Sequence, residues 1–85
     1  MTYSLYYSKR AVKDVSNLKA AKLAWKAEEL CKSLAVNPMP LHSKQLSGDL
    51  KGKRSIRINL QHRLVYEILE EEKIVKILSM WSHYE

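Results

Sequence analysis

The spacing of apolar side chains changes several times along the 85-residue chain, and each spacing predicts a different element. Residues 2–8 alternate, with Tyr3, Leu5 and Tyr7 on one side, a period of two that is typical of a strand. Ser8 then suits a helix N-cap, because its hydroxyl can accept a hydrogen bond from a free backbone N–H. We therefore expect a strand that leads directly into a helix.

Two stretches of helical spacing follow this strand, and both recur every three or four residues: Ala11, Val12, Val15 and Leu18, then Leu23, Ala27, Leu30 and Leu34. Neither Gly nor Pro separates the stretches, so a helical hairpin and one bent helix both remain open. We expect the break at Ser16-Asn17, whose side chains compete for backbone hydrogen bonds. Pro38 and Pro40 end the helical region.

Everything after Pro40 has the pattern of strands. Residues 45–52 hold both glycines and predict a short strand and a turn, whereas residues 55–60 and 63–69 alternate. Residues 70–73 form a charged hairpin tip, and the apolar run that follows is typical of a central strand. Short connections favour antiparallel pairing. We predict one α+β domain over residues 1–85, an antiparallel four- or five-stranded sheet with an N-terminal pair of helices on one face.

The charge of the chain indicates more about its partners than its length does. The chain carries 15 Lys and Arg against 9 Asp and Glu, a formal net charge of +6. Residues 42–63 are the densest positive segment, with six basic side chains and Asp49 as the one acid. Such a balance favours a polyanionic partner, either a nucleic acid or an acidic protein. A merely solvated surface is the alternative.

The cysteine content and the distribution of apolar residues indicate the cellular compartment. One Cys cannot form an internal disulfide, so nothing indicates an oxidising environment. No apolar run is long enough for a membrane span, and the N-terminus lacks the layout of a secretory signal. We therefore expect a soluble cytoplasmic protein. Cys31 lies among apolar helix positions and is expected in the core.

Two features of the sequence contain side chains that could bind phosphate or transfer protons. Arg57 and Arg63 share one strand parity, so both are expected on the sheet face away from the core, where solubility or an ion pair with Glu67 is the alternative role. The ending Trp81-Ser82-His83-Tyr84 combines side chains that donate, accept and stack, although Trp81 and Tyr84 would also serve as a packing anchor. The three His residues have no metal-ligand spacing, so we expect neither a metal nor a cofactor.

Three segments, Arg54-Ser55-Ile56-Arg57-Ile58, Gln61-His62-Arg63-Leu64-Val65-Tyr66 and Trp81-Ser82-His83-Tyr84, resemble the RelE superfamily of bacterial type II toxins. The spacing from the middle segment to the terminal His-Tyr is similar to that of the Txe/YoeB branch. The first half of the chain matches this branch only in its length and its strand-then-helices layout.

This resemblance implies an mRNA interferase that enters the ribosomal A site and cuts the mRNA there without a metal. The 2′-OH of the RNA attacks the adjacent phosphorus, leaving a 2′,3′-cyclic phosphate or 3′-phosphate and a 5′-OH. By the same resemblance Arg63 stabilises the phosphorane charge, His83 is the general acid, Tyr84 stacks on or orients the target base, and Arg57 contacts a neighbouring phosphate. Further RNA or phosphate contacts are expected from Arg54, Lys51 and Lys53.

The general base is the point at which this sequence departs from the branch. A Glu usually serves as the base, and our alignment puts Lys44 at its position. A protonated Lys cannot accept a proton, whereas a Lys with a depressed pKa can. Electrostatic help from Lys44, Lys51 or Lys53 and a basic role for Asp49 both remain open.

The resemblance also implies an antitoxin with an acidic, partly disordered segment, beside the ribosome and mRNA as partners. A homodimer and a toxin–antitoxin hetero-oligomer both remain open, and no membrane partner is expected. Two alternatives share the fold. One is a ParE-like poison of DNA gyrase, although ParE-type chains generally lack the terminal His-Tyr. The other is a non-catalytic RNA- or protein-binding module.

Overall fold

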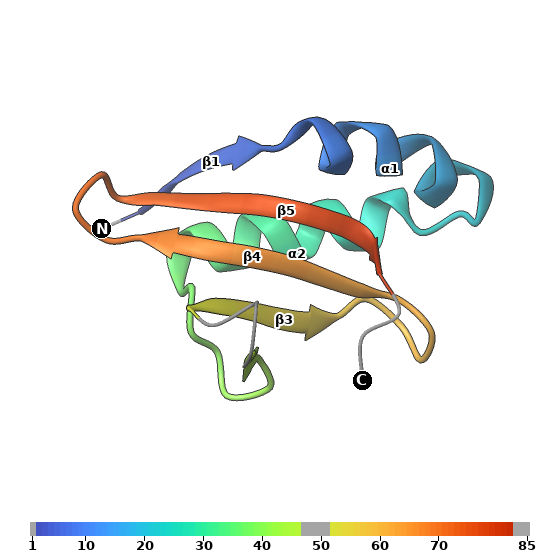
Figure 1. Ribbon diagram of the computed structural model, residues 1–85. Coiled ribbons are helices and arrows are strands. Elements are labelled where there is room, and N and C mark those ends of the chain that lie inside the picture. The colour runs from blue at the N-terminus through green and yellow to red at the C-terminus, as the bar shows by residue number, and fades with distance from the viewer. Residues whose placement is uncertain (1, 47–51, 83–85) are drawn as a thin grey trace.

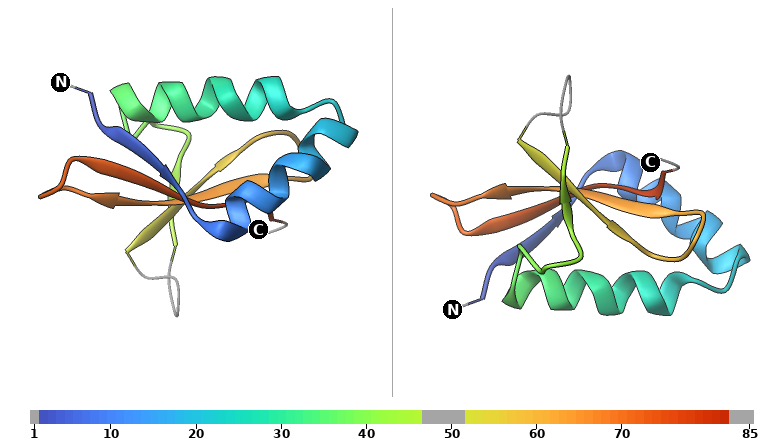
Figure 2. Two further views of the ribbon diagram at one scale, coloured as in Figure 1. Left: turned by 90° about the horizontal axis from the view of Figure 1, so that it is seen from above. Right: turned by 90° about the horizontal axis from the view of Figure 1, so that it is seen from below.

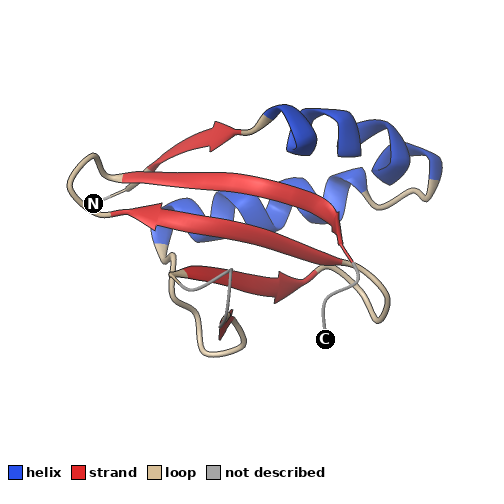
Figure 3. Cartoon of the chain, viewed as in Figure 1, coloured by secondary structure: helices blue, strands red, loops and turns tan. Residues whose placement is uncertain are grey.

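A strand, two helices and then further strands follow one another along the chain (Figures 1 and 3). The computed structural model describes residues 2–46 and 52–82. The elements in this part of the chain are β1 (Ser4–Tyr7), α1 (Lys9–Ala20), α2 (Ala24–Val36), β2 (Lys44–Gln45), β3 (Lys53–Arg57), β4 (Arg63–Leu69) and β5 (Ile74–Ser82). The predicted α+β class is confirmed.

The described strands form one five-stranded sheet in the order β1-β5-β4-β3-β2. The pairs from β2 to β5 are antiparallel, as their short connections require. However, β1 pairs parallel with β5, with Leu5 opposite Val75. The sheet is therefore mixed rather than wholly antiparallel, because connection length governs the direction of successive strands only and β1 pairs with the last strand of the chain.

The start of α1 is fastened to β5. Ser8 is the N-cap, as predicted, and its hydroxyl oxygen accepts a hydrogen bond from the backbone N–H of Ala11 at 3.1 Å. The same hydroxyl donates to the carbonyl of Leu78 at 2.8 Å. Six residues after Ser8, the buried carboxylate of Asp14 accepts from the backbone N–H of Met80 at 2.9 Å. These bonds fix the helix against the second half of β5.

The helices form a hairpin, but the break lies four residues beyond the expected Ser16-Asn17. Residues 21–23 separate α1 from α2, and Lys22 adopts a φ of 61°. The N–H of Leu23 donates to the carbonyl of Leu18 at 2.8 Å, a bond typical of helices that end on a left-handed residue. The prediction of the break was wrong because Ser16 lies on the exposed side of a continuous helix.

Both helices and the sheet share one core. Its buried apolar members come from α1, α2 and the central strands and include Leu18, Cys31, Leu34, Ile56, Leu64, Tyr66 and Ile77. Cys31 is 1% exposed, which confirms the core position expected of it. Seen from above and below, α2 covers one side of the twisted sheet (Figure 2). In the part of the chain described, no helix has the length and apolar character to cross a bilayer.

Candidate functional site

The sheet face turned away from α2, toward the viewer in Figure 1, is here called the front face. It carries the side chains of Lys53, Ser55 and Arg57 on β3, because the intervening Ile56 packs into the core on the other side. On β4 the cross-strand partners of these three residues are Glu67, Val65 and Arg63. The sequence predicts Arg57 and Arg63 on this face.

A tight turn between β3 and β4 sets the register at the front face. The side-chain oxygen of Asn59 accepts from the backbone N–H groups of Gln61 and His62 at 2.9 and 2.8 Å. The carbonyl of His62 in turn accepts from the N–H of Ile58 at 2.9 Å. This closure places Arg57 directly opposite Arg63, as the shared parity predicts.

Arg63 is nearly buried, with 6% of its surface exposed, at the first position of β4. Its Nη1 donates to the hydroxyl oxygen of Ser55, which is 1% exposed, at 3.2 Å. Within residues 2–46 and 52–82 no carboxylate forms an ion pair with this guanidinium. A buried cation whose partner is a neutral hydroxyl gains stability from an anion that binds beside it.

Arg57 lies across from Arg63 and is exposed. Two like charges on opposed positions of neighbouring strands repel each other. The alternative role, an ion pair with Glu67, is not observed for either arginine, because the carboxylate of Glu67 pairs with Lys53 at 3.9 Å. The pair therefore presents uncompensated positive charge in the described part of the chain, a setting that suits a phosphate.

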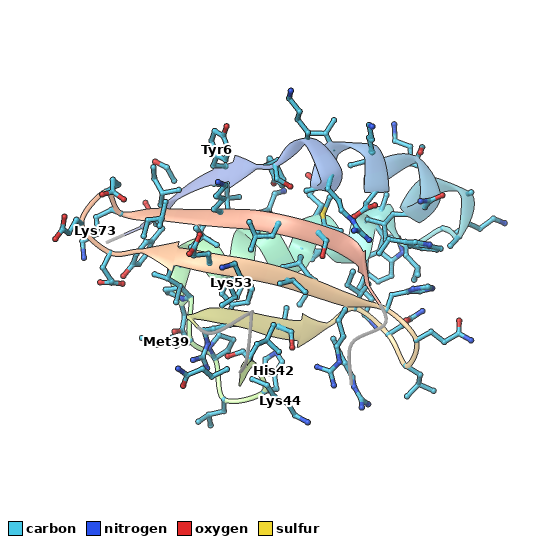
Figure 4. All side chains as sticks on the ribbon, viewed as in Figure 1. Tyr6, Met39, His42, Lys44, Lys53 and Lys73 are labelled. Atoms are coloured by element: carbon cyan, nitrogen blue, oxygen red, sulfur yellow. The ribbon has the colours of Figure 1, made fainter. Side chains whose placement is uncertain are left out.

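Two lysines extend the positive charge along the front face. Lys44 pairs with Ser55 across β2 and β3, so it shares this face, and it is exposed on the edge strand. Lys53 lies over the middle of the sheet, and Figure 4 shows it above Lys44. Because Glu67 partly neutralises Lys53, Lys44 contributes the less compensated charge.

Arg54 lies on the opposite side of β3 from Arg57. Its register partner is Tyr66, a core residue, and its guanidinium donates to the hydroxyl of Ser43 from Nη2 at 2.9 Å. The Tyr66 hydroxyl donates to the carbonyl of Pro38 at 2.6 Å. Arg54 and Tyr66 therefore hold the segment between α2 and β2 against the sheet.

The end of β5 reaches the same corner of the molecule. Ser82 pairs with Arg63, and one residue earlier the ring of Trp81 stacks on His62 at 3.8 Å between centroids and 16° between planes. The described chain therefore leaves the sheet directly across from Arg63. The predicted catalytic residues His83 and Tyr84, together with Lys51, lie outside the described residues, so their roles stay predictions.

Sequence reasoning did not single out two residues of this corner. Ser55 shares the strand parity of Arg57, a signal that placed it on the correct face but gave no indication of its bond to Arg63. In the sequence, His62 is one of three scattered His residues. Its stacking on Trp81 joins segments 19 residues apart, and no local pattern reports such a contact.

A hollow lies on the other side of the molecule, between α1 and α2. Its volume is about 300 Å³, and its walls are mostly apolar, with Val12, Leu18, Cys31 and Met80 among the lining residues. Burial raises the pKa of the Cys31 thiol. Among the residues that the structure describes, no group of three or more His, Cys, Asp and Glu side chains is placed to hold a metal ion.

A known protein family and solved structures are similar to this chain over nearly its whole length. A family model described as the ParE toxin of the type II toxin–antitoxin system parDE matches residues 5–85. A YoeB dimer from Staphylococcus aureus is similar with a TM-score of 0.81 and 30% identity, over 99% of this chain and 100% of that one. The RelBE2 toxin–antitoxin complex from Mycobacterium tuberculosis gives 0.78 and 28%, over 99% and 100%.

A further solved structure, described as a YoeB/ParE toxin from Agrobacterium tumefaciens, has a TM-score of 0.84 at 24% identity and covers 95% of this chain and 99% of that one. At that identity the likeness shows a shared fold and no more. No curated protein matches the chain by sequence.

Proposed function

Because the chain belongs to the ParE toxin family of type II toxin–antitoxin systems, and fits its YoeB-like branch, we propose that it is a ribosome-dependent endoribonuclease that cleaves mRNA in the A site. The observation that carries the proposal is Arg63, a nearly buried guanidinium with a neutral partner. β5 brings Ser82, the residue that precedes His83 in sequence, opposite to it.

The proposed reaction needs three groups. The 2′ oxygen releases its proton to solvent water and forms a bond to the adjacent phosphorus, while the bond from phosphorus to the 5′ oxygen breaks. Arg63 stabilises the negative charge on the pentacoordinate phosphorane, with Arg57 on the neighbouring phosphate. His83 gives a proton to the leaving 5′ oxygen, and Tyr84 stacks on the target base.

Lys44 is assigned an electrostatic role in this scheme. It is exposed on the edge strand and faces the same side as Ser55. In the absence of a Glu at this position, its positive charge would favour the 2′ oxyanion rather than remove the proton. The proposed activity uses ribosomes and mRNA, and it therefore places the protein in the cytoplasm.

The test is cleavage of mRNA on programmed ribosomes by the wild type and by His83→Ala and Arg63→Lys. Loss of the proton donor is expected to slow cleavage by roughly 10²–10⁴-fold. Arg63→Lys keeps the charge but loses the fork that contacts two phosphate oxygens, so a loss of about 10²-fold is expected. Lys32→Gln, an exposed charge change on α2, is the matched control. Equal cleavage by the wild type and His83→Ala would overturn the proposal.

A gyrase poison remains the second candidate, because the matching family model is described as a ParE toxin. The two functions separate in one pair of assays. If covalent gyrase–DNA complexes accumulate and ribosome-bound mRNA stays uncut, the protein is a gyrase poison and not a nuclease.

We also propose that an acidic antitoxin is the partner of this chain. The similar Staphylococcus aureus structures are described as a YoeB–YefM complex and as a heterotetrameric toxin–antitoxin complex, at 30% identity. A net charge of +6 would draw acidic side chains to the basic face that attracts RNA. Expression of the chain alone is expected to arrest growth, and co-expression of the neighbouring gene to relieve the arrest. Harmless expression of the wild type would contradict this expectation.

A further inference from the structure

A second basic surface lies on α1, outside the front face. Residues 2–27 hold six Lys and Arg and one acid, Asp14. Asp14 is buried and accepts the hydrogen bond from Met80, so its charge is turned away from the solvent side of the helix. The exposed side of the first half of α1 therefore carries positive charge that no acid in this stretch offsets. The members of this surface, here called the α1 strip, are Lys9, Arg10 and Lys13.

The α1 strip lowers the stability of its own helix. Lys9 and Arg10 lie in the first turn, where the helix macrodipole disfavours positive charge, and no acid lies in that turn. Lys9 and Lys13 are four residues apart, so they also repel each other. Within the described residues none of the three forms an ion pair. Helix stability therefore does not account for these charges, whereas an anionic partner does.

The position of the α1 strip connects it to the candidate site. The backbone N–H and the hydroxyl of Ser8 donate hydrogen bonds to the carbonyls of Ile77 and Leu78 on β5. The carboxylate of Asp14 accepts a hydrogen bond from the N–H of Met80 on the same strand. Two residues beyond Met80, about 7 Å along the strand, Ser82 lies opposite Arg63. Figures 1 and 2 show the start of α1 beside this end of β5. A strand of phosphates that occupies the Arg63 site would therefore pass close to α1.

The chemistry of the α1 strip favours a nucleic-acid backbone over a protein. Ser16 and Asn17 continue the exposed side with polar groups, whereas the apolar Val12, which is 60% exposed, borders the hollow between the helices. Protein partners are anchored by apolar and aromatic contacts, which Lys9, Arg10 and Lys13 themselves do not offer. Phosphate oxygens need only cations and hydrogen-bond donors.

We propose that the α1 strip, Lys9, Arg10 and Lys13, is a binding surface for the phosphate backbone of RNA beside the scissile position. The inference rests on the proposed function for its choice of RNA, and it adds a binding surface that the candidate site does not contain. The strip increases affinity without a role in bond cleavage.

The test is equilibrium binding of a short RNA hairpin that is 2′-O-methylated throughout, so that cleavage cannot occur. The triple variant Lys9→Gln, Arg10→Gln and Lys13→Gln is compared with a control that loses the same charge elsewhere, Lys32→Gln, Lys73→Gln and Lys76→Gln. In the strip variant we expect at least about tenfold weaker binding and a slope of log affinity against log salt that is smaller by roughly two. The control is expected to keep the wild-type slope within about half a unit.

Two results would overturn the inference: wild-type RNA affinity of the strip variant, or an equal loss of RNA affinity in the control. The first result can also come with a loss of poly-glutamate binding. That combination would assign the surface to an acidic protein. The strip variant should fold, because removing cations from the first turn relieves the macrodipole, and its melting temperature checks this. If the wild type does not cleave mRNA on ribosomes, only the proposed function is contradicted. The binding surface is still tested, because the hairpin assay measures affinity and does not need cleavage.

Discussion

At the scale of single residues, the bond between Arg63 and Ser55 is the contact on which the proposed chemistry depends most. The Ser55 hydroxyl is nearly inaccessible and accepts from one guanidinium nitrogen at 3.2 Å. It therefore restricts the rotation of the planar fork and directs the remaining donors. A small change in that orientation is costly in a site where charge develops on one phosphate.

Ser55→Ala is expected to lower kcat for cleavage on ribosomes by roughly tenfold, with little change in KM, because the lost bond orients a charged group. Ser43→Ala is the matched control, since it removes a hydroxyl that accepts from Arg54 on the other side of β3. Both variants should lose stability, but only Ser55→Ala should lose kcat. An equal fall in kcat for the two would show that Ser55 acts through stability alone.

The sequence predicted part of this corner correctly for a simple reason. Strand period two is a local rule, so the shared face of Arg57 and Arg63 follows from their positions once the turn length is known. The burial of Arg63 and its bond to Ser55 depend on three-dimensional packing, which no alternation encodes. The same period puts Arg54 on the helix side, and its expected phosphate contact stays a prediction.

At the scale of elements, the helical hairpin shows where local patterns stop being informative. Pro38 ended α2 where expected, because proline lacks the N–H that a helix requires. The end of α1 carries no such residue: Lys22 takes the left-handed conformation that glycine usually occupies. The pairing of β1 with β5 is likewise a choice between distant segments, which adjacent turn lengths do not determine.

Lys22→Gly is expected to stabilise the protein by about 1 kcal/mol, because glycine adopts a positive φ without the steric cost of a Cβ. Lys22 is exposed, so few contacts are lost with its side chain. Lys22→Ala removes the charge but keeps the Cβ, and it should leave the free energy of unfolding nearly unchanged. Urea denaturation of the three proteins measures the difference. A gain in Lys22→Ala as large as that in Lys22→Gly would assign the effect to charge.

At the scale of the whole molecule, stability depends on a junction where distant segments meet. Tyr7 at the end of β1, Cys31 in α2 and Met80 in β5 all line the hollow between the helices. Tyr7 is 40% exposed there, whereas Cys31 is almost wholly buried. Ionisation of either side chain would bring a negative charge into this apolar junction, so the fold as a whole should respond to alkaline pH.

Burial, with a further contribution from the neighbouring Cys31, raises the pKa of Tyr7 from 10.0 to about 12. The folded protein therefore holds this proton to a higher pH than the unfolded chain does. The corresponding stability is fully present below pH 10 and is lost as the pH rises toward about 12. Tyr7→Phe removes the titrating group, so its free energy of unfolding should fall less steeply over this range. Tyr6→Phe, the exposed neighbour on β1, should keep the wild-type steepness. Urea denaturation at a series of alkaline pH values compares the three, and a wild-type slope in Tyr7→Phe would mean that the junction does not sense this ionisation.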